Sequence, residues 1–239
     1  MNTPVIPQLP LGLKLRVSAD FEGFHTGGNL QAVSDIKACA NGLGERFIFL
    51  WGKSGSGKSH LLQAACRLAA DLGHTSTYIP LGEIDQFTPE ILVGLEDLCL
   101  ISIDDLQHIA TNHVWENALF RLFNRLQESG SRLLIGATGA PQTLGIGLAD
   151  LSSRLDGGLS IRLKPLDDAG RWALLKDQAD RRGLSLPDEC ATYILHHASR
   201  DTRHLVSLLE QLDNASLAAQ RPLTVPFIKM VLESSRNFT

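Results

Sequence analysis

The sequence has little of what marks several large classes of protein. It carries only four cysteines, and no two of them stand close enough for a metal-binding or redox motif: Cys39, Cys66, Cys99 and Cys190. No apolar run approaches the length of a membrane span, and the N-terminus lacks the basic start and apolar core of a signal peptide. We therefore expect reduced, buried cysteines in a cytoplasmic protein that has no membrane partner.

The chain also lacks an excess of basic residues. Its net charge is 22 − 26 = −4, which argues against a protein that coats nucleic acid. The net charge does not exclude a local basic patch. Hydrophobic residues make up 44% of the chain and charged residues 20%, a composition that excludes a disordered chain, a coiled coil and a collagen-like repeat. A length of 239 residues predicts one domain with a small appendage and a core that needs no disulfides.

What the sequence does contain is an alternation of strand and helix patterns up to about residue 165. Short apolar runs predict buried strands, and apolar residues at helical spacing predict the helices between them. The expected strands are 47–51, 75–79, 98–103, 132–137 and 159–163, and the expected helices are 29–41, 58–72, 113–129 and 148–155. This order is typical of an α/β fold with a five-stranded parallel sheet covered by helices.

After Pro165 the pattern becomes entirely helical. Amphipathic segments predict four helices, at about 168–182, 188–198, 202–220 and 225–234. We therefore expect an N-terminal tail over residues 1–20, an α/β domain over 21–165 and a small all-helical domain over 166–239. The tail is apolar, but its prolines break any regular pattern.

The segment after the first predicted strand matches the phosphate-binding pattern G-x-x-x-x-G-K-[ST] at every fixed position. Glycines let such a loop curl so that backbone N–H groups face an anion, and the N-terminus of the following helix adds its positive end. In this pattern Lys58 reaches the β- and γ-phosphates and the Ser59 hydroxyl binds Mg²⁺. The flanking strand and helix disfavour a chance glycine turn. The segment reads Gly52-Lys53-Ser54-Gly55-Ser56-Gly57-Lys58-Ser59.

The third predicted strand ends in two acids, as the magnesium site of such a loop requires. The apolar run over 98–103 is followed directly by Asp104 and Asp105. We expect Asp104 to hold Mg²⁺ through water and Asp105 to polarise the attacking water. Without the glycine loop, a pair of turn-forming aspartates would be the better interpretation.

Two further residues fit nucleotide chemistry by their position. Thr138 lies just past the fourth predicted strand, where it can sense the γ-phosphate or position water. An ordinary loop threonine with no such role fits this position equally well. Arg154 lies on the short helix before the last strand, where it can act as an arginine finger on a neighbouring subunit's nucleotide. If Arg154 is considered without the other motifs, a solvated surface arginine is a better interpretation than a finger.

The order of these elements resembles the AAA+ ATPases, and their details resemble the bacterial replication initiator (DnaA) family. The resemblance covers about residues 20–235 and implies that ADP or ATP is bound with Mg²⁺. It rests on Gly57-Lys58-Ser59-His60-Leu61-Leu62, Ile103-Asp104-Asp105-Leu106-Gln107, Phe21-Glu22-Gly23-Phe24 followed by Asn29, and Ser152-Ser153-Arg154-Leu155-Asp156.

The same resemblance assigns roles to individual residues. It implies that Phe21 and Phe24 line the adenine end of the site. His60 directly follows the phosphate loop, and from this position we expect it to pack beneath the loop. Arg203 belongs to a segment that resembles sensor 2, Arg200-Asp201-Thr202-Arg203-His204-Leu205, and is thereby expected to approach the nucleotide phosphates. One departure concerns sensor 1, because the family carries an aspartate followed by arginine where this chain has Thr138-Gly139.

The two ends of the sequence add to the interpretation. Initiators of the family continue into a helix-turn-helix domain, whereas this sequence ends at Thr239, so we expect no sequence-specific DNA binding. Gln8-Leu9-Pro10-Leu11 resembles the peptides with which bacterial proteins dock on the sliding clamp, the β subunit of DNA polymerase III. Leu9 and Leu11 would fill an apolar groove while Gln8 bonds at its rim. The alternative is a tail that packs on its own domain.

Together these features resemble the short, clamp-bound regulators of the family. The resemblance implies a negative regulator of replication initiation that makes DnaA hydrolyse its ATP through Arg154, in a head-to-tail contact, with weak or no ATPase activity of its own. A helicase loader or stand-alone AAA+ ATPase is the first alternative. A P-loop small-molecule kinase is the second, although the helical domain argues against it. The sequence also allows the chain to associate with copies of itself.

Overall fold

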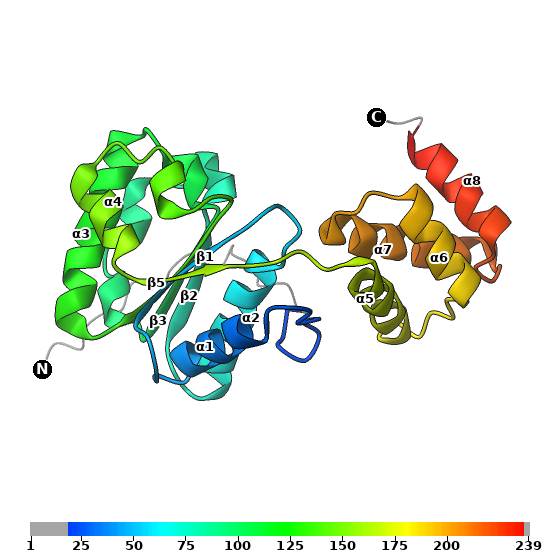
Figure 1. Ribbon diagram of the computed structural model, residues 1–239, viewed down its shortest axis with the longest axis horizontal. Helices are drawn as coiled ribbons and strands as arrows, with labels where there is room; N and C mark the ends of the chain where they lie inside the picture. Colours follow the sequence, from blue (N-terminus) through cyan, green and yellow to red (C-terminus); the bar gives the residue numbers. More distant parts are fainter. Residues whose placement is uncertain (1–18, 237–239) are drawn as a thin grey trace, which may run out of the picture. The chain divides into compact units, whose positions relative to one another are not determined.

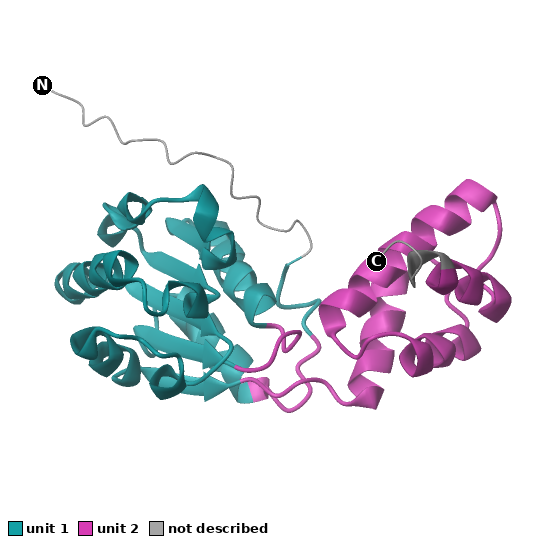
Figure 2. Ribbon diagram, turned by 90° about the horizontal axis from the view of Figure 1, so that it is seen from above, with its two compact units in different colours: residues 1–24, 31–51, 58–162 teal, residues 25–30, 52–57, 163–239 magenta. Residues whose placement is uncertain are grey.

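The computed structural model describes residues 19–236, which fall into two compact units (Figures 1 and 2). The first unit contains the segment that ends at Phe24, together with residues 31–51 and 58–162. The second contains residues 25–30, 52–57 and the chain from Leu163 onward. The predicted clamp-binding residues Gln8, Leu9 and Leu11 lie outside the described residues.

The first unit is built on one parallel sheet with strand order β2-β3-β4-β1-β5. This finding confirms the predicted five-stranded sheet. The third strand begins at Leu100 rather than at Leu98, because the Leu98 N–H closes a preceding 3₁₀ turn on the Leu95 carbonyl. The strands are β1 (Phe47–Trp51), β2 (Ser76–Pro80), β3 (Leu100–Asp104), β4 (Arg132–Ala137) and β5 (Leu159–Arg162).

Helices cover both faces of the sheet (Figure 1). On one face, Ile101 and Ile103 of β3 belong to a fully buried cluster with residues of α3 and α4. On the other face, Ser102 of the same strand bonds to Cys66 of α2 at 3.2 Å, as the alternation of side chains along a strand requires. The helices are α1 (Leu30–Ala40), α2 (Lys58–Asp71), α3 (His113–Ser129) and α4 (Ala149–Asp156).

Short 3₁₀ helices fill the chain between β2 and β3, a region for which the sequence predicted no element. They are η1 (Leu81–Gln86), η2 (Pro89–Leu92) and η3 (Leu95–Asp97), and η4 (Leu106–Ile109) follows β3. Each buries only one or two leucine or isoleucine side chains. Such short turns leave no sustained period in the sequence, which explains why the pattern did not reveal them.

The second unit is dominated by four helices around a core of its own. Its centre contains Leu175, Ile194, Leu209 and Phe227. The first helix ends at Asp180, two residues earlier than predicted, because Gly183 adopts a φ of 67° and the Leu184 N–H bonds back to Ala179. The helices are α5 (Asp168–Asp180), α6 (Asp188–His197), α7 (Thr202–Ala219) and α8 (Val225–Arg236). Over residues 19–236, no helix is long and apolar enough to cross a membrane.

Candidate functional site

The glycine loop follows β1 directly and leads into α2, as predicted. Two of its glycines are required by close approach. A Cβ atom on Gly52 would lie 2.7 Å from the Leu163 carbonyl oxygen, and one on Gly55 would lie 2.8 Å from the Asp201 carboxylate. Gly55 also has a φ of 73°, which favours glycine. The loop therefore has a fixed, curled backbone that larger residues would distort.

The loop residues fit a bound phosphate group. The Ser56 hydroxyl oxygen is buried and has no hydrogen-bond partner within residues 19–236, although a buried polar atom normally has one. Lys58, the first residue of α2, is only 6% exposed, so its charge lies close to the start of the helix. A phosphate at Ser56 would give that hydroxyl a partner. A phosphate at the start of α2 would meet Lys58 and the positive end of the helix.

The first unit brings Ser59 and Asp104, the two predicted Mg²⁺ ligands, together. Asp104 ends β3, is 1% exposed and accepts hydrogen bonds from the Tyr78 hydroxyl at 2.8 Å and the Asp105 N–H at 2.9 Å. Burial, and then the charge of Asp105, raises the pKa of Asp104, and hydrogen bonds from Ser59 and Tyr78 offset this only in part. A divalent cation would stabilise the ionised carboxylate, and a hydroxyl beside a carboxylate is oxygen chemistry that suits Mg²⁺.

Asp105 is held in an uncommon conformation beside this pair. Its φ and ψ of 57° and 43° lie in the left-handed region. Gln107 donates to its carboxylate at 2.9 Å and accepts from the Thr138 backbone N–H at 3.1 Å. Gln107 therefore connects Asp105 to Thr138, which lies immediately after β4 and is exposed. The roles of Asp105 and Thr138 in hydrolysis stay predictions.

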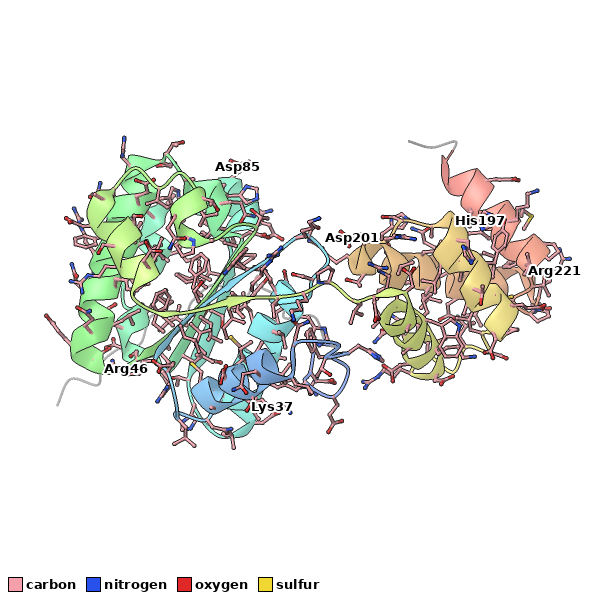
Figure 3. The ribbon with its side chains drawn as sticks, viewed as in Figure 1. Lys37, Arg46, Asp85, His197, Asp201 and Arg221 are labelled. Carbon is pink, nitrogen blue, oxygen red and sulfur yellow. The ribbon has the colours of Figure 1, made fainter. Side chains whose placement is uncertain are left out.

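In the second unit, the start of α7 contacts the glycine loop. The Ser54 hydroxyl donates to Asp201 at 2.9 Å and accepts from Arg203 at 2.7 Å, and Thr202 donates to the Gly55 carbonyl. Asp201 also caps α7 by accepting from the Arg203 N–H at 2.8 Å (Figure 3). Arg203 therefore lies at the loop, and its contact with a nucleotide stays a prediction.

The charge of Asp201 depends on these contacts. Burial is the largest single influence and opposes ionisation, but the hydrogen bonds from Ser54 and from the Arg203 backbone, with the Arg203 charge, outweigh it and lower the pKa of Asp201. Sequence analysis did not single out Asp201, Tyr78 or Gln107. For Asp201, the signal was its position directly before a predicted helix, where aspartate commonly serves as an N-cap.

The predicted adenine-end residues gather near the start of the first unit. The Phe24 ring lies 5.6 Å from the His60 ring, and His60 Nε2 bonds to the Asp20 carbonyl at 2.6 Å. Lys37 of α1 lies over the Phe21 ring at 5.1 Å (Figure 3). These contacts bring His60 together with Phe24 and Asp20. The contact of Phe21 and Phe24 with adenine stays a prediction.

Arg154 lies on α4, whose buried face carries Leu151 and Leu155. The Arg154 side chain is partly exposed, and among residues 19–236 no hydrogen bond or ion pair engages its guanidinium group. An unengaged guanidinium on a short, packed helix is chemically available to an anion of another molecule.

A separate cavity of about 540 Å³ lies where β3 and β4 begin. Cys39, His74, Cys99 and Arg132 are among its lining residues. Arg132 is already committed there, since its guanidinium donates to the carbonyls of Leu43, Gly44 and Glu45 at 2.8 to 3.2 Å. None of the predicted site residues within 19–236 is among those that line this cavity.

Comparison with known proteins identifies the family to which this arrangement of loop, acids and helical unit belongs. Residues 15–162 match the family model of the bacterial DnaA ATPase domain. The chain belongs to this family. Residues 168–232 match a second model, the lid domain of Hda. The chain is thus a Hda/DnaA-like protein.

Solved structures of DnaA agree in fold. Domain III of the Thermotoga maritima replication initiation protein DnaA is similar with a TM-score of 0.82 and 23% identity, over 92% of this chain and 98% of that chain. AMPPCP-bound DnaA from Aquifex aeolicus is similar with a TM-score of 0.72 and 24% identity, over 83% of this chain and 65% of that chain. The chain thus spans about two thirds of the longer protein.

A more distant match is the RuvB Holliday junction branch migration motor of Thermotoga maritima, with a TM-score of 0.65 and 16% identity, over 85% of this chain and 67% of that chain. At such identities the likeness concerns the fold. The likeness to DnaA domain III and the match to the Hda lid confirm the predicted class, an AAA+ α/β domain followed by a helical lid.

Proposed function

We propose that the protein is an Hda-type negative regulator of bacterial replication initiation, acting in the cytoplasm. It binds ADP or ATP with Mg²⁺, docks on the sliding clamp, and stimulates ATP hydrolysis by the initiator DnaA through Arg154. The observation that carries the proposal is the match of residues 168–232 to the Hda lid in a chain that belongs to the DnaA ATPase-domain family.

Nucleotide binding is supported by the chemistry of the loop and of the acids. The unpartnered Ser56 hydroxyl and the buried Lys58 suit a phosphate, and Ser59 with Asp104 suits Mg²⁺. The similar Aquifex aeolicus DnaA is described with AMPPCP bound, an analogue of ATP. Mg²⁺ would neutralise phosphate charge there, and Lys58 would orient the phosphates. A phosphate contact of Arg203 is proposed on the resemblance of its segment to sensor 2.

The regulatory role is supported by the unengaged Arg154. An arginine finger supplied in trans is worth about 10³–10⁵ in kcat in other phosphoryl-transfer systems. AAA+ contacts of this kind are head to tail, so the nucleotide of DnaA would face α4 of the regulator. Clamp docking is assigned to Gln8, Leu9 and Leu11 on the resemblance of their peptide alone.

The test is a single-turnover hydrolysis assay. DnaA loaded with labelled ATP is mixed with clamp loaded on DNA and with the wild-type protein, Arg154→Ala, or the matched control Arg121→Ala, an exposed arginine of α3. Wild type and Arg121→Ala should accelerate hydrolysis, and Arg154→Ala should reduce the rate by at least about tenfold. Leu9→Ala with Leu11→Ala should lose both clamp binding and stimulation.

Stimulation at the wild-type rate by Arg154→Ala would refute the finger. A second function, ATP hydrolysis by the protein itself, is supported by the two acids. Asp104 and Asp105 are both present, and Gln107 donates a hydrogen bond to Asp105. A helicase-loader-like or stand-alone ATPase would therefore show rapid hydrolysis with neither DnaA nor the clamp present. Steady-state phosphate release by the protein alone separates the two functions.

A further inference from the structure

Among the described residues of the first unit, Glu116 is the one buried charged side chain that the proposed chemistry does not use. It lies in the first turn of α3 and is 0% exposed. On the helix it shares the face of Leu119 and Phe123, three and seven residues further on, both of which are buried. A carboxylate in such a place is stable only when its oxygens accept hydrogen bonds.

Those hydrogen bonds come from the backbone on both sides of α3. One carboxylate oxygen accepts from the Thr111 N–H at 3.0 Å and from the Gly147 N–H at 2.9 Å. The other accepts from the Leu148 N–H at 2.9 Å. Two oxygens thus satisfy three N–H groups, two of which belong to the segment that enters α4.

The N-terminus of α4 depends on this acid. Leu148 is the N-cap residue of α4, and no side chain of the segment itself caps the helix. The helix has only 8 residues, a length that is marginal without tertiary support. Glu116 instead binds the N–H groups of Gly147 and of the N-cap residue Leu148 from a neighbouring helix, as the acid of a capping box binds an N-cap N–H. Its charge also suits the positive end of α4.

The rest of α4 is held by contacts of a different kind. Leu151 and Leu155 are fully buried and fix the rotation of the helix. Gln142 bonds to Asp156 at 2.6 Å near the other end. Arg154 stands six residues after Leu148, about 9 Å along the helix, so the direction in which it leaves the surface depends on how firmly the first turn is seated.

We propose that Glu116 is a positioning residue for Arg154: it seats the first turn of α4 so that the finger is held ready before the partner arrives. The inference rests on the proposed function of Arg154. Its physical basis is preorganisation, because a group already in place loses little freedom when it meets the developing charge. Glu116 itself touches no nucleotide.

The test compares Glu116→Gln with the matched control Glu96→Gln. Glutamine keeps one acceptor for the Thr111 and Gly147 N–H groups but turns an amide NH₂ toward the Leu148 N–H. Glu96 also contacts α3, through Arg125 at 2.7 Å, but it has no bond to α4. Both variants lose an acid that contacts α3, so Glu96→Gln shows what the loss of an α3 contact does when the bonds to the start of α4 remain.

Two readouts separate positioning from folding. Amide hydrogen exchange should be faster by about tenfold at Leu148 and the first turn of α4 in Glu116→Gln, with β1 and β4 unchanged. In the single-turnover assay, the maximal stimulation of DnaA should fall about tenfold while the half-saturating concentration changes less than twofold. Glu96→Gln should leave both at wild-type values.

Full stimulation by Glu116→Gln, or exchange at α4 equal to that of wild type, would overturn the proposal. The circular dichroism spectrum and nucleotide binding confirm that the variant is folded. If Arg154→Ala also stimulates fully, the proposed function fails. In that case the exchange at α4 alone decides whether Glu116 seats the helix.

Discussion

The Tyr78 hydroxyl donates a hydrogen bond of 2.8 Å to the Asp104 carboxylate. The two residues come from neighbouring strands, and Tyr78 pairs in register with Ser102, two positions before the acid. Burial, and then the charge of Asp104, raises the pKa of Tyr78 far above its ordinary value. The hydroxyl therefore stays protonated at neutral pH and can donate to the acid.

Asp104→Asn should stabilise the free protein at neutral pH. The pKa of Asp104 is raised in the fold, so the folded state holds the proton more tightly than the unfolded state. Stability therefore falls as pH rises from the ordinary value of 3.8 through the raised pKa. Removing this charge should add about 1 kcal/mol at pH 7.5 and nothing below the ordinary value, as thermal melts at both pH values can measure. A lower melting temperature for the variant at pH 7.5 would contradict this.

Tyr78→Phe should have the opposite effect. It leaves the ionised carboxylate with one donor fewer, at a cost of about 1–3 kcal/mol at neutral pH. Below pH 3.8, where Asp104 is protonated in both states, the loss should shrink. Tyr193→Phe is the control, since the Tyr193 hydroxyl has no such partner among residues 19–236. Equal losses at both pH values would mean that the hydroxyl acts through packing alone.

The contrast between Tyr78 and the glycine loop shows what the sequence can predict. The loop, the acids after β3 and the succession of strands and helices along the chain follow from local patterns, because each is a pattern of consecutive residues. The bond between Tyr78 and Asp104 depends on strand register, which no local pattern contains. Glu116 gave a faint signal, a charge on an apolar helical face, but its partners near Gly147 are 31 residues away.

Lys58→Met should abolish nucleotide binding. Lys58 is 6% exposed and opens α2 directly after the loop, so its loss removes the charge that a β-phosphate would meet. We expect the affinity for ADP in the presence of Mg²⁺ to fall at least about hundredfold, or 2.7 kcal/mol, by isothermal titration calorimetry. Lys53→Met, at an exposed position in the same loop, should change it less than about threefold. Equal losses in both variants would remove the special role of Lys58.

Asp201→Ala should destabilise the helical unit by about 1 kcal/mol, because α7 loses its N-cap and Ser54 loses an acceptor. The pKa of Asp201 is lowered in the fold, so its contribution is present above the ordinary value of 3.8 and is lost as pH falls through the lowered pKa. Urea unfolding at pH 7 and at acid pH should show the difference only at pH 7. Glu210→Ala, an exposed acid of α7, is the control.

Thiol chemistry should distinguish Cys99 from the other cysteines. Burial raises the pKa of Cys39 and of Cys66 to about 11, although the nearby Arg132 charge opposes this at Cys39 and hydrogen bonds oppose it at Cys66. Burial also raises the pKa of Cys190. Cys99 is exposed, so the expectation that all four cysteines are buried was wrong at this position. At pH 8 only about one in a thousand of the Cys39 and Cys66 side chains would be thiolate, the reactive form.

One thiol per chain should therefore react rapidly with Ellman's reagent, and Cys99→Ser should remove this rapid phase of the reaction. All four should react once guanidinium unfolds the chain, and a second rapid thiol in the folded protein would show that another cysteine is reached by solvent.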